Sequence, residues 1–381
     1  MDPWAALAGV AALAWLGVAL APWQAHRTRE RLVAAAGPAD LAAVTVLVPA
    51  RNEASHIGEC LAALQDQGIG LHAIVIDDES EDATAAIAGS FAQGGDRQRE
   101  TLQVDVVSGR PPPPAWGGKL WALQQGLAGV QRPYCLMLDA DIVLAPHFVP
   151  ALLSTARTSG AALVSVMARL QCTNLWERLL VPPFIFFFKL LYPFALVARR
   201  NSSVAAAAGG CVLVETAALQ RVGAFTQWSD ALIDDCTLAR HIKDAGMSLS
   251  LTLSDAVESR RRYTRLADFW QMVSRTAYTQ LRFSPLLLLA TTAVMLVVFV
   301  APIAAIALSA TWPGVALGSL ALAAMVFDFS AVSRFYDLPV LWRLTLPIAA
   351  LLFLAMTWDS AINYYSGTRA TWKSRRYDSQ P

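Results

Sequence analysis

The alternation of strand-like and helix-like segments in the first part of the chain constrains the fold more than any other feature. Four short segments are rich in β-branched and other apolar residues, as expected of buried strands, and they cover residues 43–50, 72–78, 102–107 and 134–141. Segments with the apolar spacing of helices lie between them, at residues 55–67, 80–93 and 117–130. This alternation predicts an α/β domain with a mostly parallel sheet and helices on both of its faces.

Polar and charged residues stand at the ends of three of these strands. Arg51 and Glu53 follow Pro49 at the end of the first strand, Asp77 and Asp78 stand at the second, and Asp139 and Asp141 stand at the fourth. In open parallel sheets, ligands bind at the carboxyl ends of the strands. We therefore expect these residues to converge on one binding site.

Asp139 and Asp141 are two residues apart, so in an extended segment their side chains share one face. Mg²⁺ and Mn²⁺ prefer oxygen ligands and often combine one or two carboxylates with phosphate oxygens. The pair therefore suggests a site for a divalent cation and a diphosphate. The alternative is a solvated loop that caps the following helix. The dinucleotide-binding and P-loop glycine patterns are absent from the sequence.

Apolar segments at both ends of the chain predict membrane helices. The sequence is 55% hydrophobic, which indicates a globular domain combined with membrane segments. Residues 3–23 are long enough to span a bilayer and are bounded by tryptophans, so we predict an anchor within residues 1–25. The arginines at 27, 29 and 31 follow this run, which favours an uncleaved anchor over a signal peptide and places the next domain in the cytoplasm.

The remainder of the chain divides by composition. We predict a cytoplasmic domain over residues 40–260, a juxtamembrane segment at 261–284, two or three transmembrane helices within 285–365 and a basic tail at 366–381. The aromatic-rich segment 182–198 contains Lys189 and suits either the membrane interface or a buried helix. These features predict a multi-pass protein of the inner (cell) membrane. The formal net charge of +1 gives no reason to expect a nucleic-acid partner.

Five motifs occur in a fixed order: "VLVPARNEA" (46–54), "VIDDESEDAT" (75–84), "GKLWALQQGL" (118–127), "LDAD" (138–141) and "IDDCTLARHI" (233–242). Together they resemble the family 2 glycosyltransferases of GT-A (Rossmann-like) fold, over roughly residues 43–245. The flanking apolar segments are similar to those of the ceramide-glucosyltransferase-like and hopene-associated branches. The stretch "RTAYTQLRFSP" (275–285) and the phenylalanine-rich segment are most similar to the hopene-associated enzymes of hopanoid biosynthesis.

The resemblance implies a role for each predicted site residue. Pro49, Arg51, Glu53, Asp77, Asp78, Gly118, Lys119 and Asp139 would bind the nucleotide-sugar donor, with Asp78 at the base. Asp139 and Asp141 would hold Mg²⁺ or Mn²⁺. Asp235 would be the general base, and Asp234 replaces the glutamate that usually precedes it. The alternative for this acidic pair is a helix start whose carboxylates complement the helix dipole.

The resemblance implies inverting transfer of a sugar from a nucleotide donor to a lipid hydroxyl, and we expect the donor to be UDP-linked. A hopanoid is the acceptor that the closest branch implies. A processive polysaccharide synthase is an alternative, but the family's QxxRW motif is imperfect around Arg282. A non-catalytic scaffold or transport protein with a degenerate domain is another. The basic run 260–263 is typical of a solvated patch, with anionic headgroups or the donor diphosphate as alternative partners.

Overall fold

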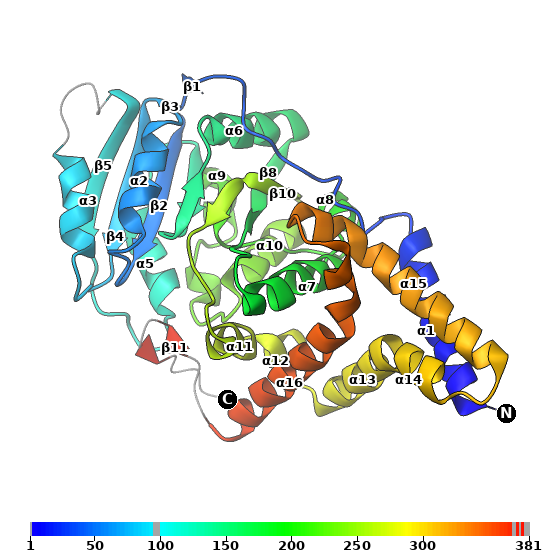
Figure 1. The fold of residues 1–381 in the computed structure, drawn as a ribbon. Helices are drawn as coiled ribbons and strands as arrows, with labels where there is room; N and C mark the ends of the chain where they lie inside the picture. The colour runs from blue at the N-terminus through cyan, green and yellow to red at the C-terminus, as the bar shows by residue number, and fades with distance from the viewer. Residues whose placement is uncertain (1, 94–99, 368–370, 373–374, 377–381) are drawn as a thin grey trace. The chain divides into compact units, whose positions relative to one another are not determined.

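The computed structural model describes residues 2–93, 100–367, 371–372 and 375–376. The chain divides into two compact units (Figure 1). The sheet unit comprises Glu30–Gln171, Leu196–Arg261 and Arg369–Pro381, and the helical unit comprises Met1–Arg29, Cys172–Ala195 and Arg262–Thr368. Each unit is described by itself below.

The sheet unit contains strands, helices and one short 3₁₀ turn. Its strands are β1 (Ala39–Asp40), β2 (Val44–Ala50), β3 (Gly68–Ile69), β4 (Leu71–Asp77), β5 (Leu102–Ser108), β6 (Tyr134–Leu138), β7 (Ile142–Leu144), β8 (Ala161–Arg169), β9 (Cys211–Glu215), β10 (Ser248–Ser259), β11 (Thr371–Trp372) and β12 (Arg375–Arg376). Its helices are α2 (Ile57–Gln65), α3 (Thr84–Ala92), α5 (Gly118–Leu127), α6 (Phe148–Ser159), α9 (Thr216–Arg221), η1 (Thr226–Trp228) and α10 (Asp234–Asp244). Helix α8 (Phe194–Ala198) continues from one unit into the other.

The main sheet has the strand order β5-β4-β2-β6-β9-β8-β10-β7. Its first four strands are parallel, and they are the four strands predicted from the sequence. Strand β9 runs antiparallel to both β6 and β8, β10 is parallel to β8, and β7 is antiparallel to β10. The α/β prediction is confirmed, and the predicted helices are confirmed as α2, α3 and α5.

The fourth predicted strand ends earlier than expected. Strand β6 stops at Leu138, and the N–H of Ile142 donates to the carbonyl of Asp139 at 3.0 Å, which closes a tight turn. The chain then pairs with β10 as β7. Asp139 and Asp141 therefore lie in a turn, and the extended geometry expected for 134–141 is wrong at its end.

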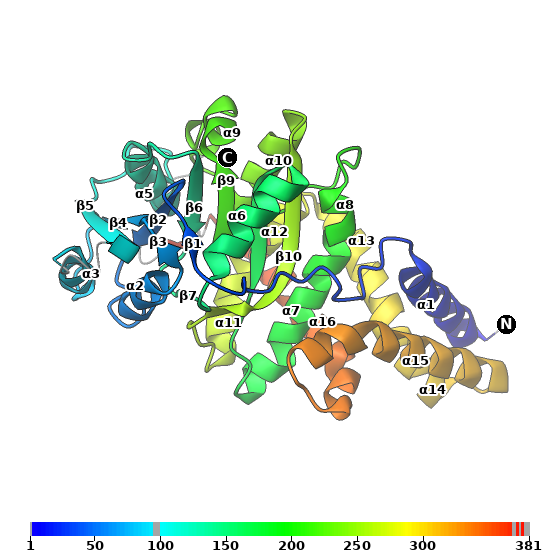
Figure 2. The same cartoon turned by 90° about the horizontal axis from the view of Figure 1, so that it is seen from above.

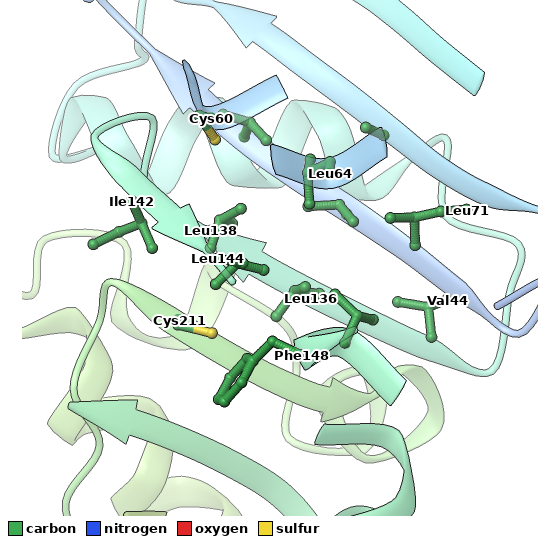
Figure 3. Close-up of a cluster of buried hydrophobic side chains, with 14 of the residues drawn as sticks. Val44, Cys60, Leu64, Leu71, Leu136, Leu138, Ile142, Leu144, Phe148 and Cys211 are labelled. Atoms are coloured by element: carbon green, nitrogen blue, oxygen red, sulfur yellow. The ribbon is translucent and has the colours of Figure 1, made fainter. Parts of the chain in front are cut away.

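Helices cover both faces of the parallel half, with α2 and α3 on one face and α5 on the other (Figure 2). All seven residues of β2 are buried, as this arrangement requires. Alternate residues such as Val46 and Val48 join a core that includes side chains of α2 and α6 (Figure 3). On the other face α5 lies very close to the sheet, because a Cβ on Gly126 would come within 2.6 Å of Ile76 Cδ1.

The helical unit contains α1 (Pro3–Leu20), α7 (Leu175–Leu191), α11 (Leu266–Ser274), α12 (Ala277–Gln280), α13 (Pro285–Met295), η2 (Leu296–Val300), α14 (Ala301–Leu308), α15 (Trp312–Phe335), η3 (Val340–Thr345) and α16 (Leu346–Tyr365). Within the described residues, four helical segments are long and apolar enough to cross a membrane: Pro3–Leu20, Pro285–Leu308, Trp312–Phe335 and Val340–Tyr365. The first lies within the predicted anchor, and the other three lie within residues 285–365, where two or three were predicted.

Aromatic contacts hold α7 inside the helical unit. Trp15 of α1 stacks on Phe186 of α7, with ring centroids 6.2 Å apart. Phe187 meets Phe353 of α16 edge to face at 5.2 Å. Lys189 is fully buried, with its Nζ 3.8 Å from the ring centroid of Phe194, so a cation–π contact accompanies its burial.

Candidate active site

The carboxyl ends of β4, β2 and β6 lie at one edge of the sheet because these strands are parallel neighbours. Pro49 is the next-to-last residue of β2 and pairs in register with Ile76. After β2, the guanidinium of Arg51 donates to the carbonyl of Asp78 at 2.5 Å and lies 3.9 Å from its carboxylate. Arg51 is only 9% exposed and Asp78 is fully buried, so this edge holds a desolvated pair of opposite charges.

Hydrogen bonds connect the loop after β2 to the segment after β4. The N–H of Asn52 donates to Ser80 Oγ at 3.0 Å, and the N–H of Glu53 donates to Thr84 Oγ1 at 2.8 Å. Asn52 has φ of 52°, a left-handed conformation that asparagine tolerates. The sequence predicted a capping role for Ser80 or Asp82 at the following helix and none for Thr84; the hydroxyls of Ser80 and Thr84 hold the Arg51–Glu53 segment in place.

Asp77 and Gly118 flank this edge. Asp77 ends β4, and its Oδ1 is buried without a hydrogen-bond partner among the described residues. A buried acceptor without a donor is costly, so this atom suits a ligand N–H or O–H group. Gly118 is the first residue of α5, and the preceding Gly117 N–H donates to the carbonyl of Ser229 at 2.7 Å. This bond fixes the start of α5, from which Lys119 projects.

Lys119 connects two acidic segments. Its Nζ lies 2.7 Å from Asp139 Oδ1 and 3.7 Å from Asp234 Oδ2. Burial lowers the pKa of Lys119, but these two carboxylates more than compensate and raise it above its usual value. Burial raises the pKa of Asp139, and Lys119 opposes that rise. Lys119 is thus a permanent cation between the turn after β6 and the start of α10.

Residues at the end of β10 hold Asp141 in place. Ser259 Oγ donates to Asp141 Oδ2 at 2.7 Å, and the Nε of Arg261 lies 3.6 Å from the same oxygen. Arg261 also reaches Glu53 Oε1, at 3.1 Å from its Nη2. The basic run 260–263 is therefore more than a solvated patch. Arg261 contacts two of the predicted site residues, and no pattern in the sequence distinguishes it from its neighbours.

Asp235 lies in the first turn of α10. Its carboxylate accepts hydrogen bonds from the N–H groups of Cys236, at 2.7 Å, and Gly209. A Cβ on Gly209 would come within 3.1 Å of Asp235 Oδ2, so the absence of a side chain there allows the close approach. Burial, assisted by the neighbouring Asp234, raises the pKa of Asp235 to about 7, against the opposing effect of Lys119. A carboxylate with this pKa can exchange a proton near neutral pH.

The donor set around Asp139 and Asp141 fits a divalent cation that takes further ligands from phosphate. The described residues contain no group of three or more His, Cys, Asp or Glu side chains placed to hold a metal ion. Two carboxylates are enough for Mg²⁺ or Mn²⁺ when diphosphate oxygens and water complete the coordination.

Contacts between side chains thus join several of the predicted site residues. One chain of contacts runs from Asp234 through Lys119 to Asp139, and another from Glu53 through Arg261 to Asp141. Arg51 and Asp78 form a separate pair on the neighbouring strand ends.

Residues 45–223 match the sequence model of the family described as "Glycosyl transferase family 2". The chain is 32% identical over 119 residues to "4,4'-diaponeurosporenoate glycosyltransferase" of Staphylococcus aureus (strain MRSA252), a match covering 31% of this chain and 29% of that protein. It is 33% identical over 100 residues to the protein of the same name from strain USA300, covering 26% of this chain and 24% of that protein. The chain therefore spans less than a third of the length of these curated relatives.

The fold resembles that of the mannosyltransferase PcManGT from Pyrobaculum calidifontis, solved in complex with GDP-Man and Mn²⁺. The TM-score is 0.54 at 18% sequence identity, with 93% of this chain and 99% of that chain covered. This likeness confirms the predicted GT-A fold with apolar helices near both ends of the chain. The motifs, the sheet and the sequence match thus agree in their similarity to the family 2 glycosyltransferases over residues 45–223.

Proposed function

We propose that this protein is a membrane-bound, metal-dependent inverting glycosyltransferase that moves a sugar from a nucleotide donor to a lipid hydroxyl. The observation that carries the proposal is the place of Asp235, whose carboxylate accepts an N–H bond from Cys236 and lies against Gly209, where burial raises its pKa to about 7. It stands next to Asp234, which Lys119 links to Asp139. A proton acceptor and a polyanion site side by side are what this reaction needs.

In the proposed reaction, the acceptor hydroxyl lies against the Asp235 carboxylate. Asp235 takes the hydroxyl proton while the oxygen forms a bond to the anomeric carbon of the sugar. The bond from that carbon to the diphosphate oxygen breaks on the opposite side, and its electrons leave with the diphosphate. One displacement inverts the anomeric configuration. Asp235 ends the step protonated and must release its proton before the next turnover.

The donor would lie along the edge formed by the ends of β4, β2 and β6. Asp77 and Asp78 offer carboxylates to a base such as uracil, whose imide N–H is a donor, while Pro49, Arg51, Glu53 and Gly118 shape the surroundings. Lys119 remains cationic and can meet a phosphate oxygen. A divalent cation held by Asp139 and Asp141 would add positive charge where the diphosphate departs. PcManGT was solved with GDP-Man and Mn²⁺, so both uridine and guanosine donors need testing.

Several features support a lipid acceptor. Four helical segments are apolar and long enough to span a bilayer. The helical unit also has a largely apolar pocket of about 490 Å³, lined by residues that include Tyr278, Leu288 and Trp358. The arginines that follow α1 support a cytoplasmic sheet unit. A hopanoid alcohol is the acceptor that the sequence resemblance favours.

The Staphylococcus aureus relatives are named for diaponeurosporenoate, and the ending "-oate" denotes a carboxylate. A carboxylic acid is therefore a second candidate class of acceptor. A carboxylate is already deprotonated at neutral pH and needs no general base. A general base assists a hydroxyl acceptor, which must lose its proton as its oxygen attacks. The presence of Asp235 in the site therefore favours an alcohol.

The test is transfer by the purified full-length protein in detergent. UDP- and GDP-linked sugars would be supplied with a hopanoid alcohol or with a carotenoid acid, and products read by mass spectrometry. We expect a glycosylated alcohol, formed with Mg²⁺ or Mn²⁺ and abolished by EDTA. Long glycan chains would favour a processive synthase. Absence of transfer to either lipid, with intact fold and donor binding, would contradict the proposal.

A further inference from the structure

Arg261 occupies a position that the proposed metal site must share. Its guanidinium lies between Glu53, at 3.1 Å, and Asp141, at 3.6 Å. Both carboxylates are nearly buried, with side chains 8% and 10% exposed, whereas the Arg261 side chain is 41% exposed. The carboxylates are thus fixed in the protein, and the cation that neutralises them comes from the solvent side.

The backbone around Arg261 is held independently of its side chain. The N–H of Arg260 donates to the carbonyl of Asp141 at 2.7 Å, and the N–H of Arg261 donates to Ser259 Oγ at 3.2 Å. The hydroxyl of Ser259 in turn donates to Asp141. The guanidinium can therefore leave the carboxylates without loss of these bonds, which keep Asp141 in place.

We propose that Arg261 is an exchangeable internal cation: it pairs with Asp141 and Glu53, and a metal ion that arrives with a nucleoside diphosphate displaces its guanidinium. This inference rests on the proposed function. A guanidinium and a divalent cation cannot both neutralise Asp141 at short range without repelling each other. Binding of the metal alone must therefore break the pairing of Arg261 without supplying it with a new anion.

A nucleoside diphosphate changes this balance. Its phosphate oxygens bring the negative charge that the displaced guanidinium can pair with, and bidentate pairing of arginine with phosphate is favourable. The diphosphate should therefore strengthen metal binding more in the presence of Arg261 than in its absence. Because coupling between two ligands is reciprocal, the metal should strengthen diphosphate binding by the same factor. Arg261 would thus discourage metal occupancy of a site that has no donor.

The test measures Mn²⁺ binding to the full-length protein in detergent, by the EPR signal of free Mn²⁺, with and without UDP and in parallel with GDP. Arg261→Gln removes the competing charge. Arg260→Gln is the matched control, because Arg260 pairs with Glu59 and Glu258, each at 2.9 Å, and its bond to Asp141 comes from the backbone. Circular dichroism would establish that both variants fold.

We expect Arg261→Gln to bind Mn²⁺ alone about fivefold more tightly than the wild type, the factor for an ion pair of about 1 kcal/mol at a partly exposed position. We also expect the gain in Mn²⁺ affinity on adding the nucleotide to be smaller in Arg261→Gln than in the wild type. Arg260→Gln should match the wild type in both measurements.

Two outcomes overturn the inference in different ways. Equal Mn²⁺ affinity and equal nucleotide coupling in wild type and Arg261→Gln, with transfer intact in the wild type, would overturn the exchange and leave the proposed function standing. If neither protein binds Mn²⁺ with or without nucleotide, both the exchange and the metal-dependent function are wrong.

Discussion

Two pairs of aspartates in the sheet unit look alike in the sequence and differ in their surroundings. In the pair after β6, each carboxylate faces a cation: Lys119 for Asp139 and Arg261 for Asp141. In the pair at the start of α10, Lys119 lies 3.7 Å from Asp234, while Asp235 accepts backbone N–H bonds. Burial raises the pKa of Asp235 to about 7, because the nearby charge of Lys119 offsets only part of the effect of burial.

The comparison shows that residue type alone does not assign a role. Carboxylates paired with cations can exchange those cations for a metal ion. A carboxylate held by neutral donors beside a second acid becomes a proton acceptor near neutral pH. We therefore expect substitutions at the two pairs to produce different defects, one in proton transfer and the other in metal-dependent binding.

The largest effect is expected from Asp235→Asn. Removing a general base typically costs about 10²- to 10⁴-fold in rate. The asparagine has the same shape, so binding of donor and Mn²⁺ should be retained, and kcat should fall while the Kd for the donor stays constant. Asp244→Asn, at the exposed far end of α10, is the control. Undiminished turnover in Asp235→Asn would remove Asp235 as the base.

Asp141→Asn should produce the complementary defect. Loss of a residue that only supports a metal ligand typically costs about 10- to 100-fold in affinity. Because Asp141 would contact the metal itself, donor binding in the presence of Mn²⁺ should weaken by more than this. Binding measured in EDTA should not weaken, since Asp141 would act on the donor through the metal ion, and loss of its charge frees Arg261, 3.6 Å away, for the diphosphate. If donor binding proves indifferent to both EDTA and this substitution, Asp141 is not a metal ligand.

Sequence reasoning identified the parallel half of the fold because its information is local. Strands β2, β4 and β6 are continuous apolar segments, and their ends carry the polar residues that converge on one edge. The predicted extended geometry of Asp139 and Asp141 was wrong because the turn that begins at Asp139 leads into β7, whose pairing with β10 joins segments more than 100 residues apart.

The contacts of Arg261 could not be predicted from the sequence. Its partner Glu53 is 208 residues away in the sequence, and three neighbouring arginines at 260–262 are equivalent until the fold orients them. Asp234 was noted only as a replacement for glutamate, and its contact with Lys119 depends on how α5 and α10 meet. Local patterns predict which segments form strands and helices, while contacts between distant segments decide which charges meet.

The pH dependence of transfer tests the same comparison with a smaller effect. Asp235 must be ionised to accept a proton, so activity should fall about tenfold per pH unit below a pKa of about 7 and level off above it. Steady-state kcat measured across pH, at saturating donor and Mn²⁺, would show this acidic limb, the part of the profile in which activity falls at low pH. A flat profile from pH 5 to pH 8, with chemistry rate-limiting, would contradict the assignment.

Two substitutions should move this limb in opposite directions. Lys119 lowers the pKa of Asp235, so Lys119→Gln should shift the limb to higher pH. Asp234 raises that pKa, so Asp234→Asn should shift it to lower pH. A general disturbance of the site would lower activity without opposite shifts, so the signs of the two displacements decide between these explanations.

The smallest effect is expected from Gly209→Ala. The new methyl group would lie 3.1 Å from Asp235 Oδ2 and 3.4 Å from its Cβ, so the Asp235 side chain must move by a few tenths of an ångström. A misplacement of 1 Å can cost about 10²-fold, so a shift of this size should lower kcat several-fold. Mn²⁺ affinity should be unchanged, because neither Asp139 nor Asp141 is displaced. Gly89→Ala, in a position with open space, is the control. A parallel loss of Mn²⁺ affinity in Gly209→Ala would mean that the two aspartate pairs move together and that their separate roles need revision.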